Sequence, residues 1–233
     1  MADLIALLLV TLAGLFGTGA DDETFAQLLT EAVEAKKPVP MEEIQVACQG
    51  CGLQQIDGIS FSFADLTLEP LLIDSAEVEV ERLHHDSKGR ITMDGLGFSA
   101  RIRESDLTDA LQSHVEKLSD ATISIDEQGL TLSGSHQLLA LRIPYSVRGK
   151  LGVENGSQLV FHIDQSQLSG MRMPAGLNAL IEKEVNPVYD LKAFAARSKK
   201  DIERAKAQLG YEFQLQIEEI SYGEGHIIVD GSA

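Results

Sequence analysis

The segment from Leu139 to Val153, LALRIPYSVRGKLGV, alternates apolar and polar residues along its whole length. Every odd-numbered residue in it is apolar except Gly149, and the even-numbered positions include Arg142, Arg148 and Lys150. A period of two predicts a β-strand with one apolar and one solvated face. A strand of this length would span roughly 50 Å, whereas strands usually contain about five or six residues. Burial of such a face would contribute on the order of 10–20 kcal/mol, so the fold must provide a cover for it.

Other segments alternate in the same way and predict further strands. Two of them change phase, near Ala64-Asp65 and near Asp94-Gly95, as at a bulge, and such shifts allow long strands to bend. Asn155-Gly156, directly after the long strand, is a strong hairpin signal. The expected strand segments and hairpins are 58–68, 75–83, 91–102, 121–134, 139–153, 158–168 and 211–231.

Four segments follow helical spacing. They are residues 21–37, with acidic residues at the N-terminal end; 105–118, with Ser105 as the N-cap; 173–187; and a charged segment at 190–210. Between the first helix and the first strand we expect a loop that holds both cysteines. Because hairpins connect most strands and helical crossovers are few, the fold class is α+β with a mostly antiparallel sheet.

The N-terminus is apolar from Leu4 to Phe16, apart from Thr11 and Gly14, and small residues follow up to Ala20. A run of this length is short for a membrane span and fits a secretory signal peptide, residues 1–20, cleaved near Ala20. The run is preceded by Asp3 instead of a basic residue. An uncleaved membrane anchor and the first helix of a cytosolic protein are the alternatives.

The chain of 233 residues has 36 acidic and 19 basic residues, which gives a formal net charge of −17. Nucleic acid is excluded as a partner on this basis, because phosphate binding requires a basic surface. Contact with lipid would depend mainly on apolar surface. Arg101, Arg103, Arg142, Arg148 and Lys150 are the candidates to meet phosphate headgroups, but solvation or pairing with acids on neighbouring strands is favoured.

No catalytic motif is visible: the sequence contains no GxSxG, SxxK, HExxH or Walker loop. A local disulfide or a free pair is favoured for Cys48 and Cys51 over a redox dithiol or half of a zinc site. His84-His85-Asp86 precedes a turn and is weak as a metal site. We therefore expect a protein without enzymatic activity, catalytic residues, metal or cofactor.

The order of segments resembles a known family. The segments that carry the resemblance are GISFSFADLTL, RESDLTDAL, the helix ending in NPVYDL and the terminal LQIEEI…GHIIVDG. They are similar to segments of the LmeA-like phospholipid-binding proteins, which belong with the tubular lipid-binding (TULIP, BPI-like) domains. The similarity covers roughly residues 55–230. The charged helix at 190–210 and the leading segment with CQGC depart from the family pattern.

The resemblance implies a long, strongly curved antiparallel sheet wrapped around amphipathic helices, with an elongated apolar cavity between them. It also implies export to the periplasm or cell envelope, bound phospholipid or another acyl-chain lipid, and transient membrane contact. Residues 21–54 would form an N-terminal helix and cysteine loop, and 55–233 a single domain. The residues expected to line the cavity are Phe61, Phe63, Phe98, Leu111, Val115, Leu141, Ile143, Tyr145, Leu177 and Ile181. One alternative is a scaffolding or interaction module of the envelope with a fully packed core. Another is an enzyme that acts on lipid or glycan, which would need histidines and carboxylates clustered in a cleft.

Overall fold

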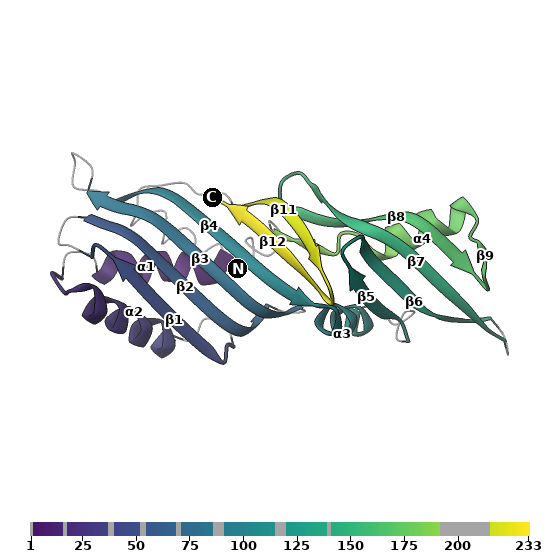
Figure 1. Ribbon diagram of the computed structural model, residues 1–233, viewed down its shortest axis with the longest axis horizontal. Coiled ribbons are helices and arrows are strands. Elements are labelled where there is room, and N and C mark those ends of the chain that lie inside the picture. The colour runs from purple at the N-terminus through teal and green to yellow at the C-terminus, as the bar shows by residue number, and fades with distance from the viewer. Residues whose placement is uncertain are drawn as a thin grey trace.

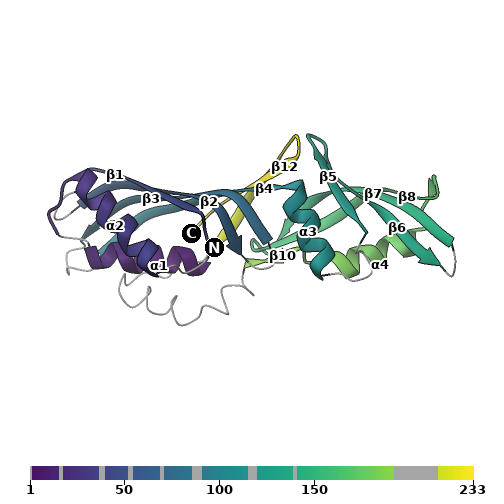
Figure 2. The same ribbon diagram turned by 90° about the horizontal axis from the view of Figure 1, so that it is seen from below.

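The computed structural model describes residues 2–15, 18–36, 40–51, 55–68, 71–85, 91–114, 120–138, 141–191 and 215–233. It is an elongated molecule in which two antiparallel sheets lie end to end (Figure 1). Helices α1 (Ala2–Leu15) and α2 (Asp22–Lys36) lie on one face of the first sheet. Helices α3 (Glu104–His114) and α4 (Ala175–Val185) lie on the same side of the second sheet (Figure 2).

The first sheet has six strands in the order β1-β2-β3-β4-β12-β11. Their bounds are β1 (Glu43–Gln49), β2 (Gln55–Leu68), β3 (Leu71–His85), β4 (Ile91–Arg103), β11 (Gln216–Gly223) and β12 (His226–Ser232). All neighbours pair antiparallel. The C-terminal hairpin therefore completes a sheet that the N-terminal half of the chain begins.

The second sheet also has six strands, in the order β10-β8-β7-β6-β5, with β9 paired to β8. Their bounds are β5 (Thr122–Asp126), β6 (Gly129–Leu138), β7 (Leu141–Glu154), β8 (Gln158–Leu168), β9 (Met171–Arg172) and β10 (Tyr189–Asp190). The long strand expected from the alternating run is β7. Its two central neighbours, β6 and β8, are joined to it in antiparallel register.

The α+β class with antiparallel sheets is confirmed, but the strands form two sheets instead of one, and neither is strongly curled. The division occurs where β4 ends at Arg103 and the chain enters α3 directly. On the far side of β4 the partner is β12, so β5 cannot join that edge and starts a new sheet. Local alternation predicts strands but carries no information about which strand takes the next edge.

The expected phase shifts are present in the burial pattern. In β2 the alternation of buried side chains ends at Phe63 and resumes one position out of phase at Leu66. In the facing strand β3 the same change lies between Ala76 and Ile73. The pairing register is unchanged across this point, because Phe63 faces Ala76 and Leu66 faces Ile73. Both strands therefore change phase together, with Asp65 at φ 48°, and no extra residue is inserted.

Gly149, the exception in the alternating run, lies where the register between β7 and β8 shifts. A β-carbon at this position would collide with the carbonyl oxygen of His162, so only glycine permits this approach of the two backbones. The turn after β7 is also as expected: Asn155 and Gly156 have φ values of 52° and 66°, the left-handed conformation of a two-residue hairpin.

Residues 43–49, expected to lie in a loop, form edge strand β1, with Ile44 buried opposite Phe63. The alternation of Ile44, Val46 and Cys48 is the signal that identifies this strand. Cys48 and Cys51 are joined in a disulfide. The carboxylate of Asp22 accepts hydrogen bonds from the backbone N–H groups of Gly50 (3.1 Å) and Cys51 (2.7 Å), which holds the disulfide loop against the start of α2.

Helix α2 agrees with its prediction and buries Phe25, Leu29 and Val33. Helix α3 begins one residue before the expected N-cap Ser105, and α4 follows Pro174 as expected. The charged helix expected at 190–210 lies outside the described residues beyond position 191. Among the described helices, none is both long enough and apolar enough to cross a membrane.

Candidate functional site

An apolar cavity of about 300 Å³ lies at the junction of the two sheets. Both sheets, α3 and the segment that follows α4 contribute to its wall. The lining residues are Leu71, Ile102, Leu107, Ala110, Leu111, Ile123, Leu130, Leu132, Leu151, Leu159, Phe161, Val185, Pro187, Val188, Tyr189 and Ile227.

The chemistry of this wall is uniform. Every described lining residue is aliphatic or aromatic, and among them Tyr189 carries a polar side-chain group. No acid, base, histidine or cysteine is among them. Such a wall can bind by exclusion of water and by dispersion contacts, and its occupant must itself be apolar.

Helix α3 is fixed over the cavity by polar contacts with β5, an edge strand of the second sheet. The Thr108 hydroxyl accepts a hydrogen bond from the N–H of Ile123 (2.9 Å), and the Glu104 carboxylate accepts one from the N–H of Ile125 (2.9 Å). These side chains satisfy backbone donors that an edge strand leaves without a partner strand. The apolar side of the helix, with Leu107 and Leu111, is thereby directed to the cavity.

The chain after α4 is fixed to β8 in a similar way. The Asn186 side chain accepts a hydrogen bond from the N–H of Phe161 (2.6 Å) and donates one to its carbonyl oxygen (2.9 Å). Glu182 accepts a hydrogen bond from the N–H of Ile163 (3.0 Å). Polar side chains of both helices therefore bind the backbone of the second sheet, and their apolar residues are left to enclose the space between them.

Tyr222 joins the two sheets beside the cavity. Its hydroxyl accepts a hydrogen bond from the N–H of Leu151 in β7 (2.6 Å) and lies 3.3 Å from the carbonyl oxygen of the same residue. Burial raises the pKa of Tyr222, although the hydrogen bond with Leu151 acts in the opposite direction. The N–H of Ile217 also donates to the carbonyl oxygen of Gly156 (2.8 Å), so β11 contacts the β7–β8 hairpin at two points.

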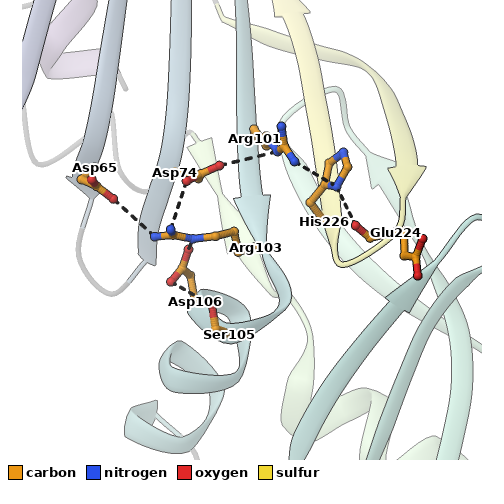
Figure 3. Close-up of polar contacts among 8 residues, drawn as sticks. All are labelled: Asp65, Asp74, Arg101, Arg103, Ser105, Asp106, Glu224 and His226. Atoms are coloured by element: carbon orange, nitrogen blue, oxygen red, sulfur yellow. Dashed lines mark hydrogen bonds and ion pairs between the residues drawn. The ribbon is translucent and has the colours of Figure 1, made fainter.

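A polar cluster at the end of β4 adjoins this junction (Figure 3). The Arg103 guanidinium contacts the carboxylates of Asp106 at 2.9 Å, Asp74 at 3.2 Å and Asp65 at 3.3 Å. The hydrogen bond and attraction from Asp106 raise the pKa of Arg103, with weaker help from the other two acids. The cluster thus connects β2, β3 and β4 to α3.

Three of the arginines considered for phosphate headgroups, Arg101, Arg103 and Arg148, are paired with acids. Besides the contacts of Arg103, Arg101 lies 3.5 Å from Asp74 and 3.4 Å from the His226 ring, and Arg148 binds Asp126 at 2.6 Å. The favoured expectation, that these residues are solvated or paired with acids, is confirmed for these three. Within the described residues, no group of three or more His, Cys, Asp or Glu side chains is arranged to hold a metal ion.

The structure separates the ten residues expected to line a cavity. Leu111 lines the main cavity, and Phe98 lines a smaller one of about 40 Å³ on the first sheet. Phe61 and Phe63 are buried in the first sheet with their rings stacked at 6.4 Å, and Tyr145 is buried away from the main cavity. Ile143 and Ile181 are half-buried and are not part of its wall. Val115 lies outside the described residues, as do the side chains of Leu141 and Leu177.

Most of the cavity wall was not singled out from the sequence. Leu130, Leu132, Leu151, Leu159 and Phe161 lie on the apolar faces of strands that the alternation does predict. The alternation assigns these residues to an interior face. It does not separate the part of that face that packs against a helix from the part that adjoins a cavity.

The fold and the site define an α+β protein of two antiparallel sheets with an apolar cavity between them and helices along one side. Comparison with known proteins finds no match among family models, curated proteins or solved structures.

Proposed function

We propose that this protein binds lipid, with an acyl chain of a phospholipid or a related lipid in the cavity between the two sheets. The observation that carries the proposal is the wall of that cavity, in which every described lining residue is aliphatic or aromatic and none carries a charge. Ligand cavities typically have volumes of roughly 300–1,000 Å³, so this one is at the small end of the range. It suits a single hydrocarbon chain.

The energetics favour a carrier over a permanent store. Each buried methylene contributes about 0.8 kcal/mol, so ten of them contribute about 8 kcal/mol relative to water. The same chain gains a similar amount in a bilayer. Exchange between the membrane and the cavity is therefore close to neutral, which allows both uptake and release during transient membrane contact.

The tubular arrangement of the LmeA-like and TULIP domains belongs to the same proposal. It is supported by the position of all four described helices on one side of the two sheets (Figure 2) and by the coordinated phase shift of β2 and β3 at Asp65. In this interpretation the two sheets together correspond to the wrapped sheet of the family, and the cavity at their junction is the lipid tunnel.

Export to the cell envelope is also part of the proposal. The disulfide between Cys48 and Cys51 is a bond that persists in oxidising compartments, and residues 4–16 have the composition of a signal peptide. The net charge of −17 argues against nucleic acid as a partner. We propose no catalytic role, because hydrophobic contact is the chemistry that this wall supplies.

The alternative is a scaffolding module of the envelope with no lipid site. The first sheet favours it, because Phe61, Phe63 and Val78 are almost fully buried. The two proposals differ in the occupant of the junction cavity, and one experiment separates them.

The test is native mass spectrometry after incubation with phosphatidylglycerol vesicles and removal of free lipid. We expect the wild-type chain to carry one lipid. Ala110→Phe places a ring into the cavity and should lower lipid occupancy at least tenfold. Ala179→Phe, the same change at an exposed position of α4, should leave it unchanged. A wild-type chain that repeatedly has the mass of the bare polypeptide would refute lipid binding and favour the scaffolding module.

A further inference from the structure

Helix α1 is an apolar rod within the core of the first sheet. Leu4, Ile5, Leu8, Leu9 and Leu12 are 0 or 1% exposed, which places them among the most buried side chains of the protein. The helix lies behind strands β2 to β4 in Figure 1 and beside α2 on the inner face of the sheet (Figure 2). A segment with the composition of a removable leader therefore covers much of this face.

Few polar contacts hold α1 in place. The described side-chain hydrogen bond of this helix is the one that the Thr11 hydroxyl accepts from the Lys36 ammonium group at the end of α2 (2.9 Å). Its buried side chains belong to the apolar cluster that includes Phe61, Phe63 and Val78. An apolar rod held mainly by hydrophobic contact can be exchanged for another of similar length.

The junction cavity continues toward the inner face of the first sheet, because it shares lining residues with a smaller cavity there. The small cavity of about 40 Å³ on the inner face of the first sheet is lined by Phe98, Ala100 and Val229, among others. Four of its residues, Leu71, Ile102, Leu159 and Tyr189, also line the main cavity. Apolar surface therefore continues from the junction cavity onto the first sheet.

We propose that the face of the first sheet beneath α1 is a second acyl-chain site and that α1 is its removable cover. The inference rests on the proposed lipid function. A phospholipid has two acyl chains, whereas the junction cavity suits one. The 14-residue helix is about 21 Å long, and the hydrocarbon layer of one bilayer leaflet is roughly 15 Å thick, so the space that α1 vacates is long enough for one chain. With α1 in place the protein holds one chain, and without it both chains of one lipid.

Fluorescence quenching tests this because the chain contains no tryptophan. Two variants each introduce one tryptophan in place of a buried ring. Phe161→Trp, called the junction reporter, places an indole at the junction cavity. Phe61→Trp, called the sheet reporter, places one in the first sheet. A specific protease site inserted between Gly19 and Ala20, beside exposed Thr18, allows α1 to be cut from the protein after it has folded. The probe is an excess of vesicles of phosphatidylglycerol with brominated acyl chains, which quench tryptophan on contact.

We expect the lipid to quench the junction reporter before and after cleavage, and to quench the sheet reporter at least twofold only after cleavage. Quenching of the junction reporter without quenching of the sheet reporter in the cleaved protein would overturn the second site and leave the proposed function intact. Equal quenching of the sheet reporter before cleavage would show that α1 is not a cover. No quenching of the junction reporter in either form would refute the proposed function itself.

A pair of substitutions in the uncut chain provides an independent test. Leu8→Glu places a charge at a buried position of α1, and Gly14→Glu places the same charge at an exposed one. Leu8→Glu should displace the helix and allow quenching of the sheet reporter, whereas Gly14→Glu should not. If Leu8→Glu prevents folding, the cleaved protein alone decides the outcome.

Discussion

Tyr222 occupies a gap in the backbone pairing of β7, and its hydroxyl should be required for stability. The paired stretch of β6 and β7 ends at Leu130 and Gly149, so Leu151 lies beyond its reach. The Tyr222 hydroxyl takes the place of a strand there, at 2.6 Å from the Leu151 nitrogen and 3.3 Å from its carbonyl oxygen. Tyr222→Phe removes this hydroxyl and keeps the ring.

The cost follows from the burial of the groups that lose their partner. Leu151 is 8% exposed, so water has little access to its backbone. A buried donor or acceptor without a hydrogen bond costs about 1–3 kcal/mol. With a urea dependence of about 3 kcal/mol per molar, the unfolding midpoint should fall by roughly 0.3–1 M.

Tyr145→Phe is the matched control, measured by urea unfolding under the same conditions. The Tyr145 hydroxyl is buried and finds no hydrogen-bond partner among the described residues. Its removal should be neutral or slightly stabilising, because an unsatisfied polar group is lost. The reasoning is refuted if Tyr222→Phe is no more destabilising than Tyr145→Phe.

Three further predictions concern pH and the N-terminal region. Burial raises the pKa of Tyr145 to about 12 and also raises that of Tyr222, so the folded state retains protons that the unfolded state loses near pH 10. The free energy of unfolding should therefore fall as pH rises from about 10 to 12. In urea unfolding, the variant with both Tyr145→Phe and Tyr222→Phe should lose less stability over that interval. Hydrogen bonds from Gln128 and Arg148 lower the pKa of Asp126, so the stability that this carboxylate contributes is lost as pH falls below about 4. Arg148→Met should raise the pKa of Asp126 in an NMR titration. An unchanged pKa would contradict the role of the ion pair. Asp22→Ala removes the carboxylate that accepts hydrogen bonds from the N–H groups of Gly50 and Cys51. It should lower the free energy of unfolding in urea by about 0.5–1.5 kcal/mol. Glu23→Ala, at another exposed position in the first turn of α2, should lower it less.

Much of the local structure could be predicted from the sequence because its causes are local. The alternation of Leu139 to Val153 predicts β7, Asn155-Gly156 predicts the turn after it, and the shift at Asp65 predicts a change of phase in β2. Strand β1 was missed although Ile44, Val46 and Cys48 alternate, because the nearby glycines and cysteines suggested a loop.

The candidate site was less predictable, because a lining residue and a packed residue have the same character in sequence. Phe61 and Phe161 both lie on the apolar face of a strand, but Phe61 packs within the first sheet and Phe161 lines the cavity. The difference depends on where a second sheet begins and which helix covers each face. Neither is encoded in the period of a single strand.

The sequence by itself determined the class of the fold, the two faces of its long strands and the acidic surface, since these follow from residue type and spacing. Tertiary structure alone decided the return of the C-terminal hairpin to β4, and with it the division into two sheets. It also placed α1 beneath the first sheet and left the junction open. The physical reason is that hydrophobic burial does not depend on direction, so only the complete packing fixes which apolar surfaces meet.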